Sequence, residues 1–273
     1  MVKTYGGAMI KGKKIVLTVV IISLFIIAEL LKILEPQILM AQRHNYFLIH
    51  TLSSLLYVFG LIALMVSEKA HMFGKPQKAI FILPALAVAI TNFPFFAILN
   101  GETSLVHSGV LDFILFGSFC VSTALFEELL FRGVFFPIMI YYLPKSKKGL
   151  VVAIAISSAV FGLAHILNIF SMSTQATLMQ IGYSFLTGAL FCFTLVKTRN
   201  VLICAFAHAL FNFGGLLFSS QGLGTGNVFN LPFILATAIV GITTTVIIIF
   251  SLIRYDDAER QTLYHYLGYG CEK

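Results

Sequence analysis

The hydrophobic residues of this chain fall into long runs that short polar segments separate. Eight runs reach the roughly 20 residues that a helix needs to cross the hydrocarbon core of a bilayer. The fourth run is able to continue to Leu143, with a kink or loosening at Pro137. The pattern predicts an all-α polytopic membrane protein with eight transmembrane helices joined by tight hairpins. The runs are 14–34, 46–66, 79–99, 108–137, 149–171, 174–196, 200–219 and 230–253.

The composition agrees with this class of protein. Of the 273 residues, 59% are hydrophobic and 11% are charged, whereas a soluble domain carries roughly 25% charged residues. No hydrophilic stretch is long enough for a second domain, so we expect residues 1–273 to form a single membrane domain. Lysines precede the run from Ile15 to Leu34, as in a signal peptide. That run is too long for a cleaved signal and predicts a retained first helix.

The basic residues gather on one side of the predicted membrane, in the segments 1–13, 67–78, 138–148, 197–199 and 254–273. These segments, with Lys14 at the membrane edge, hold 15 of the 18 basic residues. Cytoplasmic loops carry such an excess of Lys and Arg, so both termini are predicted to be cytoplasmic. The net charge of +7 therefore reflects topology, and we expect no nucleic-acid partner.

The four cysteines are Cys120, Cys192, Cys204 and Cys271. Three lie in apolar runs, and no two have the spacing of a CxxC motif. We therefore expect neither a disulfide framework nor a zinc knuckle, and interpret them as small apolar residues.

Ionisable residues at membrane depth are costly, so each is a candidate for function. Glu29 and Lys32 are spaced to pair with each other, which favours a structural role. Asp112 lies near the outer end of its helix, at the interface. The set is Glu29, Lys32, Asp112, Glu127, Glu128, Arg132, His165 and His208.

Two adjacent carboxylates stand in one strongly apolar run. Glu128 and Arg132 are four residues apart with the acid first, which favours an ion pair on one helix face. Glu127 points about 100° away and has no local partner. Burial raises the pKa of a carboxyl group and a nearby guanidinium lowers it. A carboxylate in such a position is suited to act as a general base on water.

Helix pairing predicts which residues meet Glu127. Glu127 and His165 are each 19 residues from position 146, the centre of a basic turn, so an antiparallel hairpin places them at equal depth. Asn168, three residues after His165, also reaches this region. On the seventh run, His208 and Asn212 share a face, and both are able to donate hydrogen bonds to an oxyanion.

The predicted depths of the two histidines in the membrane do not agree. Counted from the inner end of its helix, His208 is shallower than His165. Either the seventh helix begins recessed within the bundle, or the fourth and fifth helices project into the cytoplasm.

Three motifs follow one another along the chain: Glu127-Glu128-x-x-x-Arg132, Phe161-x-x-x-His165 and His208-x-x-x-Asn212. They resemble the EExxxR, FxxxH and HxxxN motifs of the CAAX protease and bacteriocin-processing (CPBP, or ABI) family, in the family's order. The resemblance covers about residues 108–220, which we take as the catalytic helix core. It implies an eight-helix intramembrane endopeptidase, related to the type II CAAX prenyl endopeptidase.

The resemblance also implies roles for these residues. Glu127 activates the attacking water with the help of His165, His208 and Asn212 stabilise the oxyanion, and Glu128 with Arg132 supports the site. The family was long described as metalloproteases, and Glu127, His165 and His208 would be the zinc ligands if a metal were required. The HExxH motif is absent, so we favour a metal-free glutamate mechanism and expect no cofactor.

The expected substrate is a membrane-associated protein or peptide, including a prenylated one. Short loops and the absence of an appended domain resemble prokaryotic members, which predicts a multi-pass protein of a prokaryotic plasma membrane. The pattern does not define an oligomeric state.

Two other functions fit the same residues. One is a non-catalytic scaffold or bacteriocin self-immunity protein that retains the site for structural reasons. The other is a transporter with a buried proton relay, which predicts inverted repeats and paired broken helices. The sequence contains neither.

Overall fold

The structure is a computed structural model that describes residues 43–170, 173–219 and 221–269. The predicted first helix, with Glu29 and Lys32, lies outside the described residues, as does Cys271. The elements in chain order are α3 (Arg43–Ser67), the 3-10 helix η1 (Ala79–Ile82), α4 (Leu83–Thr91), α5 (Phe95–Leu99), β1 (Thr103–Leu105), α6 (Val110–Glu128), the π-helix η2 (Leu129–Phe135), α7 (Phe136–Tyr142), α8 (Lys147–Ala164), the 3-10 helix η3 (His165–Phe170), α9 (Thr174–Thr198), α10 (Val201–Leu216), β2 (Gly224–Gly226), α11 (Leu231–Ile253) and α12 (Asp257–Leu267).

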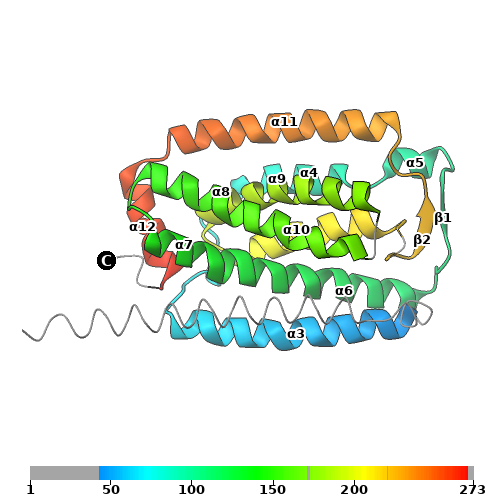
Figure 1. Ribbon diagram of the computed structural model, residues 1–273, viewed down its shortest axis with the longest axis horizontal. Helices are drawn as coiled ribbons and strands as arrows, with labels where there is room; N and C mark the ends of the chain where they lie inside the picture. The colour runs from blue at the N-terminus through cyan, green and yellow to red at the C-terminus, as the bar shows by residue number, and fades with distance from the viewer. Residues whose placement is uncertain (1–42, 171–172, 220, 270–273) are drawn as a thin grey trace, which may run out of the picture.

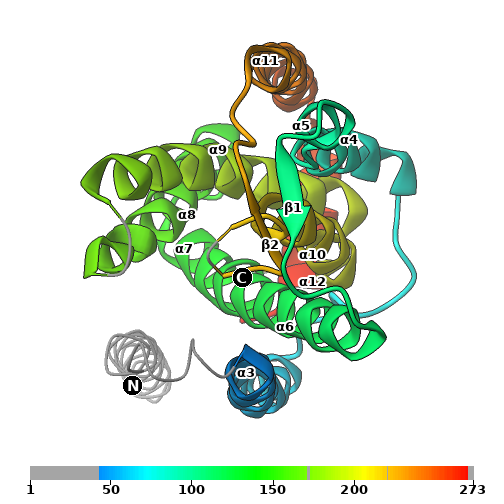
Figure 2. The same cartoon turned by 90° about the vertical axis from the view of Figure 1, so that its right-hand side faces the viewer.

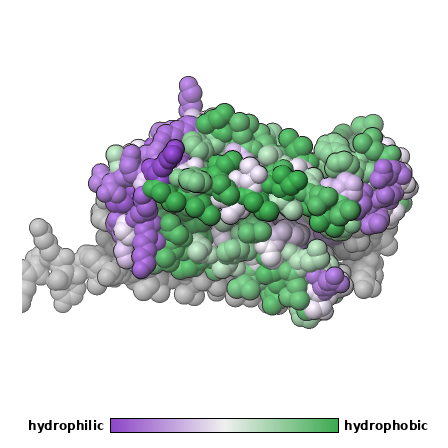
Figure 3. Space-filling view, turned by 90° about the horizontal axis from the view of Figure 1, so that it is seen from above, coloured by the Kyte–Doolittle hydropathy of each residue, from purple (hydrophilic) through white to green (hydrophobic). Residues whose placement is uncertain are grey.

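Each predicted run from 46–66 onward contains a helix. Within the described residues, six helical stretches are long and apolar enough to cross a membrane. The seventh apolar helix, α10, is shorter. Large apolar side chains such as Leu56 and Phe59 of α3 face outward, as expected of a lipid-facing surface. In Figure 3 a hydrophobic band separates hydrophilic residues at the two ends of the visible face. The chain is therefore a multi-pass α-helical membrane protein.

The helix α10 lies at the centre of the bundle and packs against α6, α4 and α9. Beyond α6 lies α3, and α8 pairs with α9. Figures 1 and 2 show α11 at one edge of the bundle, on the side of α4, and α3 at the opposite edge. This arrangement places the carboxylates at the end of α6 beside the centre of α10.

The fourth predicted span is irregular in the middle. It runs from Val110 to Tyr142, and the α-helical geometry widens to a π-helix over Leu129–Phe135. Pro137 stands in the first turn of the α-helix that follows. Proline lacks an N–H group and its ring clashes with the carbonyl four residues earlier, so a wider turn upstream relieves the clash. The expected loosening is therefore present, but it lies before Pro137 and includes Arg132.

At the end of the bundle away from α12, the connections are longer than the tight hairpins that the sequence predicted. The segments between α5 and α6 and between α10 and α11 pair as a short antiparallel sheet, with Thr103 opposite Gly226 and Leu105 opposite Gly224. This sheet joins two loops that are more than 100 residues apart, a pairing that hydrophobic runs do not encode.

The turn between α9 and α10 is buried. Arg199 and Asn200 are covered, because the Gln77 N–H donates to the Thr198 carbonyl and the Val201 N–H donates to the Met72 carbonyl. The terminal helix α12 closes over the same turn. α10 therefore begins recessed in the bundle, which is the first of the two arrangements considered for His208.

The three described cysteines, Cys120, Cys192 and Cys204, are free thiols and are buried. Their expected role as small apolar residues is confirmed.

Candidate functional site

The end of α6 and the π-helix η2 place two neighbouring carboxylates in different surroundings. Glu128 is fully buried, whereas the Glu127 side chain keeps 15% of its surface exposed and lines a cavity. The cavity has a volume of about 870 Å³ and is walled by α3, α4, α6, α8, α9, α10 and α11. Only one of the two acids can therefore meet a molecule in the cavity.

Arg132 fixes Glu128 through the predicted ion pair. The Arg132 Nη1 donates to Glu128 Oε1 at 2.9 Å, and Nη2 donates to the Gly188 carbonyl at 3.2 Å. The guanidinium lies over the Phe161 ring, 4.3 Å from its centroid. A planar cation with several donors suits such a buried position. Arg132 thereby ties η2 to both α8 and α9.

The hydrogen bond from Arg132 to the Gly188 carbonyl depends on the absence of a side chain at Gly188. A side chain at this position would meet the backbone of Ser158 at 3.1 Å and the Phe161 ring at 3.3 Å. Because glycine has no Cβ, α9 approaches α8 closely here and its carbonyl comes within reach of Arg132.

His208 bridges the two carboxylates. Its Nδ1 lies 2.8 Å from Glu128 Oε1, and its Nε2 lies 3.5 Å from Glu127 Oε2. A carboxylate only accepts, so Nδ1 carries a proton. If the ring is an imidazolium, Nε2 also carries one and both carboxylates have a donor. The ring stacks on Phe191 with centroids 5.1 Å apart.

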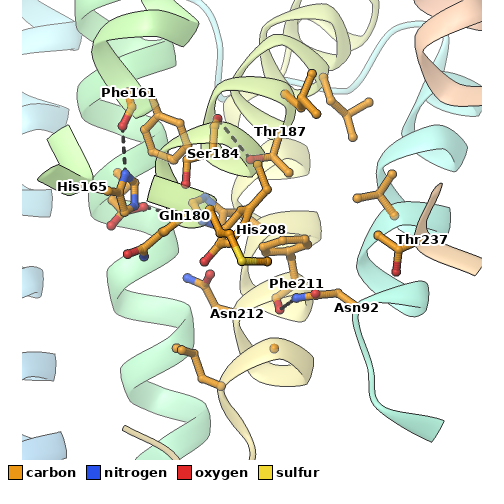
Figure 4. A pocket seen from close by; sticks show the side chains of 18 of the residues that line it. Asn92, Phe161, His165, Gln180, Ser184, Thr187, His208, Phe211, Asn212 and Thr237 are labelled. Atoms are coloured by element: carbon orange, nitrogen blue, oxygen red, sulfur yellow. Dashed lines mark hydrogen bonds and ion pairs between the residues drawn. The ribbon is translucent and has the colours of Figure 1, made fainter. Parts of the chain in front are cut away.

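His165 has its own fixed orientation. Its Nδ1 donates to the Phe161 carbonyl at 2.9 Å, so in the neutral ring the lone pair is on Nε2. It starts η3 and lines the same cavity as Glu127. Figure 4 shows His165 and His208 on different helices around this space, with Asn212 one turn after His208.

The structure thus brings Glu127, His165, His208 and Asn212 to one cavity. The charged partner that it gives Glu127 is His208. A direct contact between Glu127 and His165 stays a prediction. Asn168 also lines the cavity, and its Nδ2 donates to Gln180 Oε1 at 2.7 Å. Asp112 lies at the far end of α6, where it pairs with His44 at 2.6 Å.

The side chains of the site include potential metal ligands. Within the described part of the chain, no three His, Cys, Asp or Glu side chains are placed together to hold a metal ion. Glu127, His165 and His208 in this arrangement do not fit a three-ligand zinc site.

Sequence reasoning missed several residues of the cavity. His50 of α3 lines it, as do Gln180, Tyr183, Ser184 and Thr187 of α9. The α9 residues follow the spacing i, i+3, i+4 and i+7, which defines one helix face. Their polarity inside an apolar run was a usable signal. On α3, His50 and Ser54 also line the cavity, and this pair of polar residues gave a weaker signal.

The fold and this cavity define a multi-pass membrane protein with a carboxylate–histidine site at membrane depth. Residues 109–214 match the family model described as type II CAAX prenyl endopeptidase Rce1-like. That segment includes all three motifs. Residues 109–214 are therefore similar to this family, which is the resemblance that the motifs predicted. No curated protein and no solved structure matched the chain.

Proposed function

We propose that this chain is an intramembrane endopeptidase that hydrolyses a peptide bond of a membrane-associated protein or peptide. The observation that carries the proposal is that two adjacent acids have different surroundings. Arg132 and His208 both donate to Glu128, whereas Glu127 faces an 870 Å³ cavity. An open carboxylate that is held in place beside a closed one is suited to act as a general base on water.

In the proposed reaction, Glu127 takes a proton from a water molecule that His165 Nε2 helps to orient. The water oxygen attacks the scissile carbonyl carbon, and the carbonyl oxygen becomes an oxyanion. Asn212 Nδ2 and His208 Nε2 donate hydrogen bonds to that oxyanion. The C–N bond then breaks, and the proton held by Glu127 passes to the leaving amine.

This role for His208 sets a condition on its charge. Because Nδ1 donates to Glu128, Nε2 can donate only if the ring carries both protons. Glu128 accepts the hydrogen bond from Nδ1 and so fixes the orientation of the ring. Arg132 in turn holds Glu128 in place. Glu128 and Arg132 thus position His208 for its contact with the oxyanion.

We further propose that eight helices span the membrane and that both termini are cytoplasmic. The basic turns, including Lys145 to Lys148 and the α9–α10 turn, lie at the end that α12 covers. The positive-inside rule makes that end cytoplasmic. Residues 108–220 would form the catalytic core, in a prokaryotic plasma membrane.

The test uses the full chain in phospholipid nanodiscs. The probes are a farnesylated peptide ending in Cys-aliphatic-aliphatic-Met and its unlipidated counterpart, with products identified by mass spectrometry. The wild type should cleave, and Glu127→Gln should lower the rate about 10³-fold, within the range for loss of a general base. The matched control is Glu102→Gln, which changes an outer acid bound to Asn230 and should retain activity.

The outcomes separate the alternatives. Cleavage that survives Glu127→Gln, or a wild type that cleaves neither probe, would overturn the proposal. A scaffold or immunity role predicts biological activity that Glu127→Gln leaves intact. A proton relay predicts flux in liposomes that this change abolishes, without peptide cleavage. Retention of the rate after prolonged dialysis against a chelator would support the metal-free mechanism, and loss with recovery on zinc addition would contradict it.

A further inference from the structure

A polar strip on α9 faces the cavity and belongs to none of the three motifs. Gln180, Tyr183, Ser184 and Thr187 line it from one face of the helix. Figure 4 shows Gln180, Ser184 and Thr187 on the side of the cavity near Phe161 and His165. The strip therefore borders the same space as Glu127.

The members of the strip differ in what their polar atoms do. The Thr187 hydroxyl donates to the Ser184 carbonyl of its own helix at 3.3 Å, which is an ordinary arrangement inside an apolar helix. Gln180 instead accepts from Asn168 Nδ2 at 2.7 Å. That bond holds the Gln180 carboxamide with its Oε1 atom toward η3, which leaves the Nε2 group free of this contact.

Tyr183 stands one turn after Gln180 and is in polar contact with it. The Tyr183 ring packs against Phe211, with centroids 6.0 Å apart. The residue is 44% exposed although it lies on a wall of the cavity, and it is within electrostatic reach of Glu127. Its hydroxyl is thus held beside the space where a substrate would meet Glu127.

An extended peptide in this cavity brings one N–H and one C=O group per residue. Much of the lining is apolar, and at membrane depth water is scarce, so the cavity must supply partners for those groups. Asn168 Nδ2 donates to Gln180 Oε1. The Tyr183 hydroxyl, one turn further along the same wall, is a donor that a substrate carbonyl can use.

We propose that Tyr183 donates a hydrogen bond to a backbone carbonyl of the substrate next to the scissile bond, and that Gln180 positions Tyr183 for this contact. The inference rests on the proposed function and extends it. It assigns α9 as the wall that binds the substrate backbone, beside the oxyanion side on α10.

The first experiment measures binding without turnover. In the Glu127→Gln background, fluorescence anisotropy follows the farnesylated peptide ending in Cys-aliphatic-aliphatic-Met. Tyr183→Phe removes only the hydroxyl and should weaken binding about fivefold, as for one lost hydrogen bond. Gln180→Leu should weaken it by a smaller factor. The matched control is Tyr142→Phe, an exposed tyrosine at the end of α7 outside the cavity, which should not change binding.

The second experiment distinguishes a direct contact from a structural effect. A set of peptides carries an amide-to-ester replacement at one position each, which weakens the carbonyl as an acceptor. The effect of Tyr183→Phe should shrink for one peptide only, the one altered at the contacted carbonyl. In otherwise wild-type enzyme, Tyr183→Phe should raise KM while kcat stays within about twofold, since the contact is uniform through the reaction.

Unchanged binding in Tyr183→Phe, or an equal effect on every ester peptide, would overturn this inference while leaving the proposed function intact. If the wild type neither binds nor cleaves the peptide, both proposals fail together. If the wild type cleaves and Glu127→Gln does not, the proposed function stands and the α9 contact is judged on the binding data alone.

Discussion

Among the described residues, two clusters of paired charges are built differently. The site cluster consists of Glu127, Glu128, Arg132 and His208. The cap cluster consists of Lys78, Lys197, Arg199 and Glu259. In the cap cluster, Lys78 and Lys197 both pair with the Glu259 carboxylate, and Arg199 donates to the Glu259 carbonyl. Each cluster joins segments that are distant in the sequence.

The two clusters differ in how far their charged side chains are able to move. Glu128 and Arg132 are completely buried and their neighbours are rings and a close-packed backbone. In the cap cluster, Lys78 is 50% exposed, and long side chains reach their partners through flexible stems. A charge that loses its partner can turn toward water in the cap cluster but not in the site cluster. The site cluster is therefore suited to hold one geometry, and the cap cluster to anchor α12.

The largest expected effect comes from breaking the site cluster. Arg132→Met leaves the Glu128 carboxylate buried with His208 as its remaining partner, which should cost about 3–5 kcal/mol of unfolding free energy. The measurement is denaturation of the purified protein in mixed detergent micelles. The double variant Glu128→Leu with Arg132→Met removes both charges and should recover part of the loss. A double variant less stable than the single one would contradict this account.

A smaller effect tests the close backbone packing around the site. A side chain at Gly162 would meet the Ile181 carbonyl at 2.8 Å and the Phe185 N–H nitrogen at 3.2 Å. Gly162→Ala should therefore push α8 from α9 and cost about 1–3 kcal/mol, with a loss of activity through displaced His165. The matched control is Gly182→Ala, where nothing lies within 4 Å. Equal stability of the two variants would show that the helices are free to separate.

The smallest expected effect comes from the cap cluster. Glu259→Gln removes the carboxylate shared by Lys78 and Lys197, but the exposed Lys78 regains water and Lys197 keeps contact with the Tyr255 ring at 4.6 Å. We expect a loss of about 1–2 kcal/mol and a kcat within about twofold of the wild type. Thermal unfolding and the peptide assay measure the two quantities separately. A loss as large as that of Arg132→Met would abolish the distinction between the clusters.

Much of the fold was predictable because a membrane-spanning helix forms all its backbone hydrogen bonds within itself and carries apolar side chains where it faces lipid. The described helices lie where the hydrophobic runs indicate, from α3 to α11. Features with no local pattern were not predicted: the β1–β2 pairing, the interruption of the third span at Pro94 and the amphipathic α12. These depend on contacts between segments far apart in the chain.

The residues predicted to be catalytic line one cavity, whereas the contacts within the site were predicted less completely. The i, i+4 pair of Glu128 and Arg132 follows from helix geometry alone, and the structure has it at 2.9 Å. The bridge from His208 to both acids does not follow from any spacing, since it joins two helices across 80 residues. The depth predicted for His208 assumed that every helix starts at the same level in the membrane. The α9–α10 turn is buried in the bundle, so α10 does not start at that level.

By itself, the sequence determined that this is a membrane protein, which residues are too costly to bury without purpose, and which of them share a helix face. Those properties depend on composition and on a fixed helical period. Only the tertiary structure decided that Glu128 is closed off while Glu127 faces the cavity, and that α9 contributes a polar wall. Burial of one of two adjacent acids depends on how α8, α9 and α10 pack around them, and that packing is a property of the whole bundle.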